Sequence, residues 1–136
     1  MKKILDIAKY LTKKYKDEKK EEIDELKLHK LLYFSQKESI MLTNDFLFEE
    51  DFEGWYLGPI NKLVRKEFEI IKMGKEDISL KDIEKKIIDR VFDRYKDMDS
   101  YKLSDLSHKE YSWIKSRIGL KRGEKGNQKL LKEDIK

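Results

Sequence analysis

The chain has no cysteine and few of the residues that make sharp turns, with one proline and six glycines among its 136 residues. The lack of cysteine excludes disulfides, thiol catalysis and zinc sites built from thiolates. A β-sandwich or β-barrel needs a turn signal about every 8–12 residues. The scarcity of turn residues therefore disfavours both of these architectures.

Long apolar runs are also missing. No stretch approaches the roughly 18–20 apolar residues of a membrane-spanning helix. Residues 1–16 begin with two lysines after the methionine, as a signal peptide can, but the apolar stretch that should follow is interrupted by Asp6, Lys9, Lys13 and Lys14. That spacing is typical of an amphipathic helix. We therefore expect no export signal, no membrane partner and a cytoplasmic location.

Charge of both signs is abundant, with 32 Lys and Arg against 28 Asp and Glu, but it is unevenly spread. Residues 1–22 carry +3, residues 23–114 carry −4 and residues 115–136 carry +5. This pattern is consistent with a surface that steers a charged partner, and solvated faces that pair internally would explain it as well. Only five of the basic residues are arginine, which makes nucleic acid an unexpected partner because base readout and phosphate clamps favour arginine.

Apolar residues recur with helical spacing along most of the chain. The spacing predicts helices over residues 3–16, 24–42, 59–74, 80–96 and 103–117, and a last short helix around residues 130–135. Asp24 and Ser79 are the expected N-caps of the second and fourth helices, and Pro59 is expected in the first turn of the third.

The aromatic segment before Gly58 lacks helical spacing and predicts short extended stretches at residues 46–48 and 53–57. We therefore expect a mainly α fold, a single compact domain over residues 1–136 with about five to seven helices and a short β-hairpin near residues 46–57. The basic segment 119–136 is expected to form a short helix or a tail.

No arrangement of catalytic or metal-binding residues stands out. His29 and His108 are 79 positions apart, and neither has a partner at the spacing of a metal-ligand motif. Gly-rich phosphate loops and Gly-x-Ser-x-Gly elbows are absent from the sequence. The adjacent acids at 49–51 are expected to form a solvated loop rather than an acid/base pair. The sequence therefore predicts no enzyme, no cofactor and no metal.

Three blocks of the sequence occur in a distinctive order. Residues 26–36 read Leu-Lys-Leu-His-Lys-Leu-Leu-Tyr-Phe-Ser-Gln, residues 46–60 read Phe-Leu-Phe-Glu-Glu-Asp-Phe-Glu-Gly-Trp-Tyr-Leu-Gly-Pro-Ile, and residues 103–110 read Leu-Ser-Asp-Leu-Ser-His-Lys-Glu ahead of Trp113. The blocks resemble the SocA-like, or Panacea, antitoxin domain, which also occurs in GepA-type phage-associated proteins. The family pattern is Lys-Leu-x-Lys-Leu-Leu-Tyr, then Leu-Phe with acids leading to Ala-Trp-x-x-Gly-Pro, then Leu-(Ser/Thr)-His with a later Trp. Gly54 stands where the family often has alanine, and Ser107 where it usually has threonine.

The resemblance implies an antitoxin that neutralises a cognate toxin by direct protein–protein contact. Three other functions stay open. The chain could be an adaptor that delivers a toxin to a ClpXP-type protease through its basic residues 121–136, a phage-encoded interaction or inhibitor protein, or a nucleic-acid-binding regulator.

Seven residues are candidates for partner contact: Tyr33, Phe34, Asp51, Glu53, Trp55, Tyr56 and His108. Tryptophan and tyrosine dominate binding hot spots, and one of the two adjacent aromatics at 33 and 34 is a candidate to face a partner. Each candidate also has a structural alternative, such as packing, holding a nearby base or capping a helix. Six further residues are expected to serve the fold: Leu28, Leu31, Leu32, Gly58, Pro59 and Trp113.

Overall fold

The computed structural model describes residues 3–74 and 78–136 of the chain. In chain order its elements are α1 (Lys3–Lys19), α2 (Glu25–Thr43), β1 (Glu53–Trp55), β2 (Gly58–Ile60), α3 (Lys62–Met73), α4 (Asp82–Tyr95), α5 (Ser100–Ser107), α6 (Tyr111–Ser116) and the 3-10 turn Lys132–Asp134. The expected mainly α fold with one short hairpin is confirmed. None of the described helices combines the length and the apolar character needed to cross a membrane.

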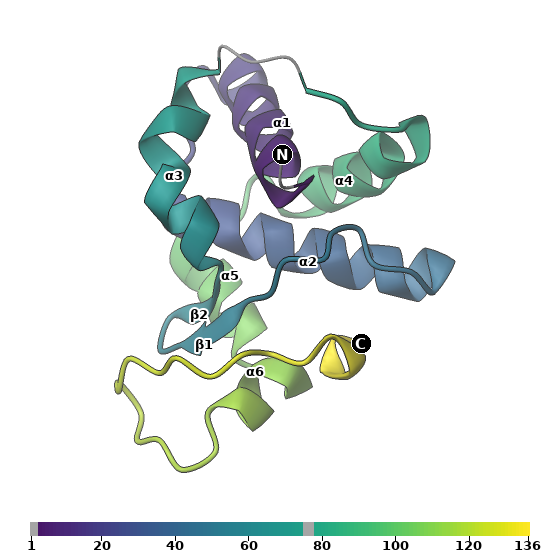
Figure 1. The fold of residues 1–136 in the computed structure, drawn as a ribbon. Helices are drawn as coiled ribbons and strands as arrows, with labels where there is room; N and C mark the ends of the chain where they lie inside the picture. The colour runs from purple at the N-terminus through teal and green to yellow at the C-terminus, as the bar shows by residue number, and fades with distance from the viewer. Residues whose placement is uncertain (1–2, 75–77) are drawn as a thin grey trace.

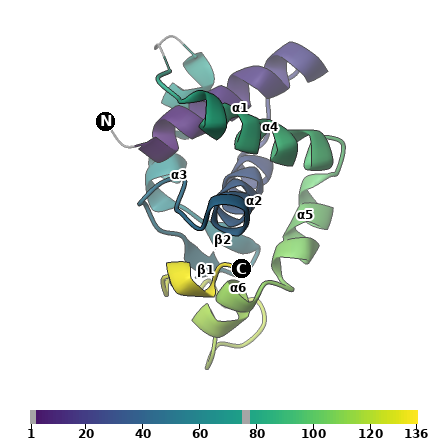
Figure 2. The ribbon, with the colours of Figure 1, turned by 90° about the vertical axis from the view of Figure 1, so that its right-hand side faces the viewer.

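Helix α2 lies at the centre, and the other elements pack around it. Figure 1 shows α1 and α4 on one side of α2, with α5, α6 and the hairpin on the other, and Figure 2 shows α2 nearly end-on in the middle. The expected core residues Leu28, Leu31 and Leu32 are fully buried, but so is Lys30. Because other elements surround α2, more of its residues are buried than the apolar face of the helix predicts.

Two helix ends follow local signals. The carboxylate of Asp24 accepts a hydrogen bond from the backbone N–H of Lys27 at 2.8 Å and caps α2, as expected. Gly74 ends α3 in the left-handed conformation, also as expected.

Two other expected helix starts are wrong. Pro59 lies in β2, and Asn61 caps α3 instead. The side-chain oxygen of Asn61 accepts a hydrogen bond from the backbone N–H of Val64. Helix α4 begins after Lys81 rather than Ser79, because the carboxylate of Glu84 accepts the backbone N–H of Lys81 at 2.7 Å.

Residues 103–117 form two helices rather than the single one expected. The backbone N–H of Glu110 bonds to the carbonyl of Ser107 at 3.1 Å in a tight turn between α5 and α6. The carboxylate of Glu110 accepts from the hydroxyl of Tyr33 at 2.9 Å and from the ammonium of Lys37 at 2.8 Å. Contacts with α2 therefore determine where the helix is interrupted, and the local sequence does not predict the interruption.

Residues 46–48 form an irregular connection rather than the expected extended strand. The cause is Gln36, which is buried: its Oε1 accepts the backbone N–H of Leu47 at 2.8 Å, and its Nε2 donates to the carbonyl of Phe48 at 2.8 Å. A side chain thus satisfies the backbone groups that a neighbouring strand would otherwise satisfy.

The C-terminal residues 119–136 pack against the hairpin rather than forming a free tail, and the short helix expected around residues 130–135 is present as the 3-10 helix Lys132–Asp134 (Figure 1, yellow). The backbone N–H of Gly54 donates to the carbonyl of Gln128, and that of Leu130 donates to the carbonyl of Phe52, both at 2.8 Å. Leu130 is 1% exposed. This segment therefore contributes to the core.

A lysine lies in the core beneath the hairpin. The Nζ of the fully buried Lys30 donates to the carbonyl of Pro59 at 3.1 Å. Gly58, with φ +118°, allows this approach: a Cβ there would lie 2.5 Å from Cε of Lys30 and 2.5 Å from Oγ of Ser107. Burial lowers the pKa of Lys30 to about 7.

Replacing Leu130 by alanine should lower the free energy of unfolding by about 2–4 kcal/mol, because the change leaves a cavity in the core. The next residue, Leu131, is 40% exposed, and Leu131→Ala should cost less than about 1 kcal/mol. Urea-induced unfolding of the two variants measures the difference. Equal costs would show that the C-terminal segment does not contribute to the core.

The stability of the protein relative to Lys30→Met should rise with pH above about pH 7. The folded state releases the proton of Lys30 near pH 7, whereas the unfolded state holds it up to about 10.5. Between these values the unfolded state binds more protons, so the free energy of unfolding increases by at most about 1.4 kcal/mol per pH unit. Urea-induced unfolding between about pH 6 and pH 9 tests this, with Lys62→Met, at an exposed lysine, as control. A parallel pH dependence of the parent and Lys30→Met would contradict it.

Candidate functional site

The hairpin turn places aromatic and apolar side chains at the surface. Strands β1 and β2 pair antiparallel with Trp55 opposite Gly58, so Tyr56 and Leu57 form a two-residue turn. The hairpin thus spans residues 53–60 and continues beyond the expected 46–57 region. Tyr56 is 48% exposed.

Contacts fix the ring of Trp55 in place. The guanidinium of Arg65 lies 5.1 Å from the ring centroid and the ammonium of Lys125 lies 4.4 Å from it. Each such cation–π contact contributes about 0.5–1 kcal/mol at an exposed site. The indole N–H also donates to the carboxylate of Glu53 at 2.9 Å. Trp55 is therefore a positioned side chain with part of its surface accessible.

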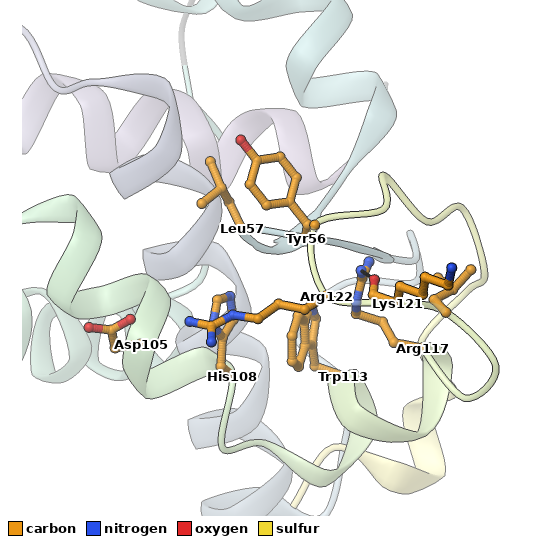
Figure 3. A pocket seen from close by; sticks show the side chains of 10 residues that line it. Tyr56, Leu57, Asp105, His108, Trp113, Arg117, Lys121 and Arg122 are labelled. Atoms are coloured by element: carbon orange, nitrogen blue, oxygen red, sulfur yellow. Dashed lines mark hydrogen bonds between the residues drawn. The ribbon is translucent and has the colours of Figure 1, made fainter.

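A column of stacked groups lies next to the turn (Figure 3). The rings of His108 and Trp113 stack with their centroids 4.2 Å apart and an interplanar angle of 14°. The guanidinium of Arg117 lies 5.3 Å from the Trp113 centroid, and Figure 3 shows it on the side away from His108. The indole N–H of Trp113 donates to the carbonyl of Trp55 at 2.7 Å, which ties α6 to β1.

Arg117 also folds the loop after α6 back towards the hairpin. Its guanidinium donates to the carbonyl of Gly54 at 2.8 Å, and to the carbonyls of Glu124 at 2.6 Å and Lys125 at 3.2 Å in the loop. These hydrogen bonds place the loop residues beside the ring column. The donors of Arg117 are thus used within the chain, while its positive charge remains.

A pocket of about 620 Å³ lies between the hairpin turn, the ring column and this loop (Figure 3). Small-molecule sites typically measure about 300–1,000 Å³. Its charged lining consists of the cations Arg117, Lys121 and Arg122 and the carboxylate of Asp105. The pocket combines aromatic faces with an excess of positive charge.

His108 presents an unused acceptor. Burial lowers the pKa of this imidazole, and a hydrogen bond with the backbone of Tyr56 opposes the effect. A bond that raises the pKa is one that the imidazole donates, so we assign the neutral tautomer with its proton towards Tyr56. The Nε2 atom is buried, and nothing in the described part of the chain donates to it.

A second pocket of about 260 Å³ also borders the hairpin turn. There His29 Nε2 meets the carboxylate of Glu25 at 3.1 Å, and Arg65 donates to the same oxygen at 3.0 Å. The hydrogen bond with His29 is the main cause that lowers the pKa of Glu25, and Arg65 adds to it. Burial lowers the pKa of His29, whose Nδ1 accepts the backbone N–H of Asn61 at 3.2 Å. These groups already satisfy one another.

Within residues 3–74 and 78–136, no three His, Asp or Glu side chains gather as metal ligands would. The two histidines serve different contacts, His29 with a carboxylate and His108 with a tryptophan ring. What the fold brings together around the turn is aromatic faces, cations and an unused acceptor. These are the groups of a binding surface.

The structure brings three of the seven candidate contact residues, Trp55, Tyr56 and His108, to the surroundings of the hairpin turn. Tyr33 and Phe34 are 0% and 6% exposed, so the structure places neither of them at the surface.

The two acidic candidates are half-buried and paired within the chain. The carboxylate of Asp51 meets Lys132 at 2.6 Å and Lys129 at 3.4 Å, which anchors the C-terminal segment. Glu53 accepts from the indole of Trp55. Of the residues expected to serve the fold, five are buried and Trp113 is half-buried; the buried ones are Leu28, Leu31, Leu32, Gly58 and Pro59.

Three residues that support or line the site were not among the candidates drawn from the sequence. Lys30 has the appearance of a surface lysine on a helix, and Arg117 and Arg122 lie in a basic segment without a motif. The glycines at 119, 123 and 126 were the one available signal, because three glycines in eight residues indicate a loop that can fold back.

Comparison with curated proteins and with solved structures gives no match. A family model, described as antitoxin SocA-like, Panacea domain, matches residues 28–114. The matched range begins in α2 and ends in α6, so it includes the hairpin, the buried Lys30 and the stack of His108 on Trp113. The match spans more than half of the chain and agrees with the three sequence blocks. The chain therefore belongs to the SocA-like, Panacea antitoxin domain family.

Proposed function

We propose that this protein is an antitoxin that neutralises a cognate toxin by binding it directly. The observation that carries the proposal is the match of residues 28–114 to a family of antitoxin domains. A tight complex that covers the functional surface of a toxin needs no chemistry from the antitoxin. The aromatic and arginine side chains around the hairpin turn are of the types enriched in protein interfaces.

The proposed contact surface is the hairpin turn with Trp55 and Tyr56. Tyr56 is 48% exposed, and the ring of Trp55 is in contact with the cations of Arg65 and Lys125. Tryptophan, tyrosine and arginine supply most interface hot spots. A ring that is already fixed loses little conformational freedom when it binds, and this favours affinity.

The other candidate residues would support this surface from behind. Asp51 anchors the C-terminal segment next to β1, and Glu53 orients the indole of Trp55. Tyr33 holds Glu110 at the start of α6, and His108 stacks on Trp113. In this proposal they set the shape of the surface without touching the toxin.

A protease adaptor that acts through a C-terminal tail has less support. The segment around Leu130 is hydrogen-bonded to β1, and Ile135 is 2% exposed. A protease could engage this segment only after it left the core, which would expose two large apolar side chains to water.

The function is tested by purifying the tagged protein from its host after nuclease treatment and identifying the co-purifying proteins by mass spectrometry. We expect one partner at near-equal stoichiometry that stops growth when expressed alone and does not do so when co-expressed with this chain. Protease subunits with a substoichiometric client would instead identify an adaptor. A partner-free protein that rescues no toxin would contradict the antitoxin function.

Tyr56→Ala should weaken toxin binding at least about tenfold, since it removes an exposed aromatic anchor at the centre of the proposed surface. Its thermal midpoint should stay unchanged, because an exposed side chain contributes little to folding. Tyr101→Ala, at a tyrosine of α5 that is 72% exposed, is the matched control. Titration of the purified toxin with each variant gives the affinities. Indistinguishable affinities for the two variants would place the toxin on another surface.

A further inference from the structure

The C-terminal segment extends the hairpin by one more extended stretch of chain. Lys129 forms an antiparallel bridge with Glu53 of β1, and Glu53 also pairs with Ile60 of β2. Strand β1 therefore lies between β2 and the C-terminal segment, which Figure 1 shows in yellow alongside β1. The segment around Lys129 is thus the outer edge of a small sheet.

The backbone at this edge is unpaired. Two hydrogen bonds hold the segment to β1: the C=O of Gln128 accepts from β1 and the N–H of Leu130 donates to β1, both at 2.8 Å. In an antiparallel pair, the residue between two such bonds directs its own N–H and C=O away from the partner strand. Within the described part of the chain, nothing bonds to the N–H or the C=O of Lys129 or to the N–H of Leu131.

Two hollows flank the edge. One of about 360 Å³ lies between α6 and the segment, with Ile118 and Leu131 in its lining, and one of about 260 Å³ lies on the side of Asp51. Lys129 and Leu131 border both of them. Side chains of an extended strand point alternately to its two faces. A strand added at this edge would therefore direct successive side chains towards the two hollows.

Apolar side chains beside the edge are open to water. Ile118 is 80% exposed, more than any other large apolar side chain in the described residues. Leu131 is exposed as well, and so is Ile114, which lies one helical turn before Ile118. Apolar groups that gather beside an unpaired strand edge are typical of a surface that pairs with another chain.

The charge at the edge selects the partner. Residues 115–136 carry +5 and contribute all but one of the residues that line the hollow beside α6. A second copy paired edge to edge would bring this positive segment against itself, and like charges opposite one another in a sheet are destabilising. A lysine on an open edge opposes such self-pairing. A strand with acidic side chains would instead meet an edge of opposite charge.

We propose that residues 127–131 dock an extended segment of a partner protein, in which acidic and apolar side chains alternate, as a further strand of the sheet. In this binding mode the backbone hydrogen bonds supply affinity, and pockets for alternate side chains supply specificity. Unlike a protease that takes hold of a tail, the added strand leaves Leu130 and Ile135 in the core. The inference goes beyond toxin neutralisation and does not rest on it, because the test uses this chain alone.

The probe is a capped peptide of about eight alternating glutamate and valine residues, since valine favours extended structure. Added to the ¹⁵N-labelled full chain, it should shift the amide signals of Lys129 and Leu131 and saturate them at or below about 1 mM. It should also slow the exchange of these two amides with deuterium, because both N–H groups become hydrogen-bonded. The amide of Ile83, an exposed residue of α4, should stay in place.

A peptide of alternating glutamate and proline is the control for charge. It carries the same charge as the probe, but proline lacks the N–H and does not fit a strand ladder. It should therefore bind at least about tenfold more weakly than the glutamate–valine peptide.

Two substitutions at one position separate the backbone from the side chain. Lys129→Pro removes the outward N–H and should weaken binding of the glutamate–valine peptide at least about tenfold. Lys129→Ala removes the same positive charge and keeps the N–H, so it should weaken binding less than about threefold. Both variants lose the ion pair with Asp51, and thermal unfolding followed by circular dichroism checks that each is folded. The exchange measurement on the parent chain depends on neither variant.

The proposal is overturned if the glutamate–valine peptide does not saturate the chain at millimolar concentration. Equal binding of the proline peptide would overturn it too, since charge alone would then attract both. Equal affinities of folded Lys129→Pro and Lys129→Ala would show that the edge backbone is not used. A dimer in light scattering that Lys129→Pro returns to a monomer would mean that the edge pairs with a second copy, which also contradicts the proposal.

Discussion

The contact of β2 with the two helices beneath it determines where the rest of the site lies. Lys30 donates from the core to the carbonyl of Pro59 at 3.1 Å, and Ser104 of α5 donates to the carbonyl of Leu57 at 2.8 Å. Position 58 must be glycine, since a Cβ would lie 2.5 Å from the Lys30 side chain. A two-stranded hairpin is marginally stable by itself. Here helices α2 and α5 hold it, so its turn is a rigid feature of the surface.

Segments that come later in the chain satisfy the outer edge of the hairpin. The indole of Trp113 donates to the carbonyl of Trp55, the guanidinium of Arg117 to that of Gly54, and the backbone N–H of Leu130 to that of Phe52. An open strand edge would invite pairing with other chains, and these three contacts cover it. They also place the ring column, the loop and the C-terminal segment around the same turn. Helix α6 and the loop are therefore held beside the turn because β1 offers them bonding partners, and α5 is held there by its bond to Leu57.

Local signals predicted the parts of the structure that depend on neighbouring residues. The helix boundaries at Asp24 and Gly74 follow from capping, which acts within a few positions. The burial of Lys30 could not be predicted, because helical spacing gives α2 a solvent face that only the later hairpin removes. In the site, motif and residue type pointed to Trp55. They did not point to Arg122, because it lies outside the three sequence blocks and reaches the pocket through a loop that Arg117 folds back.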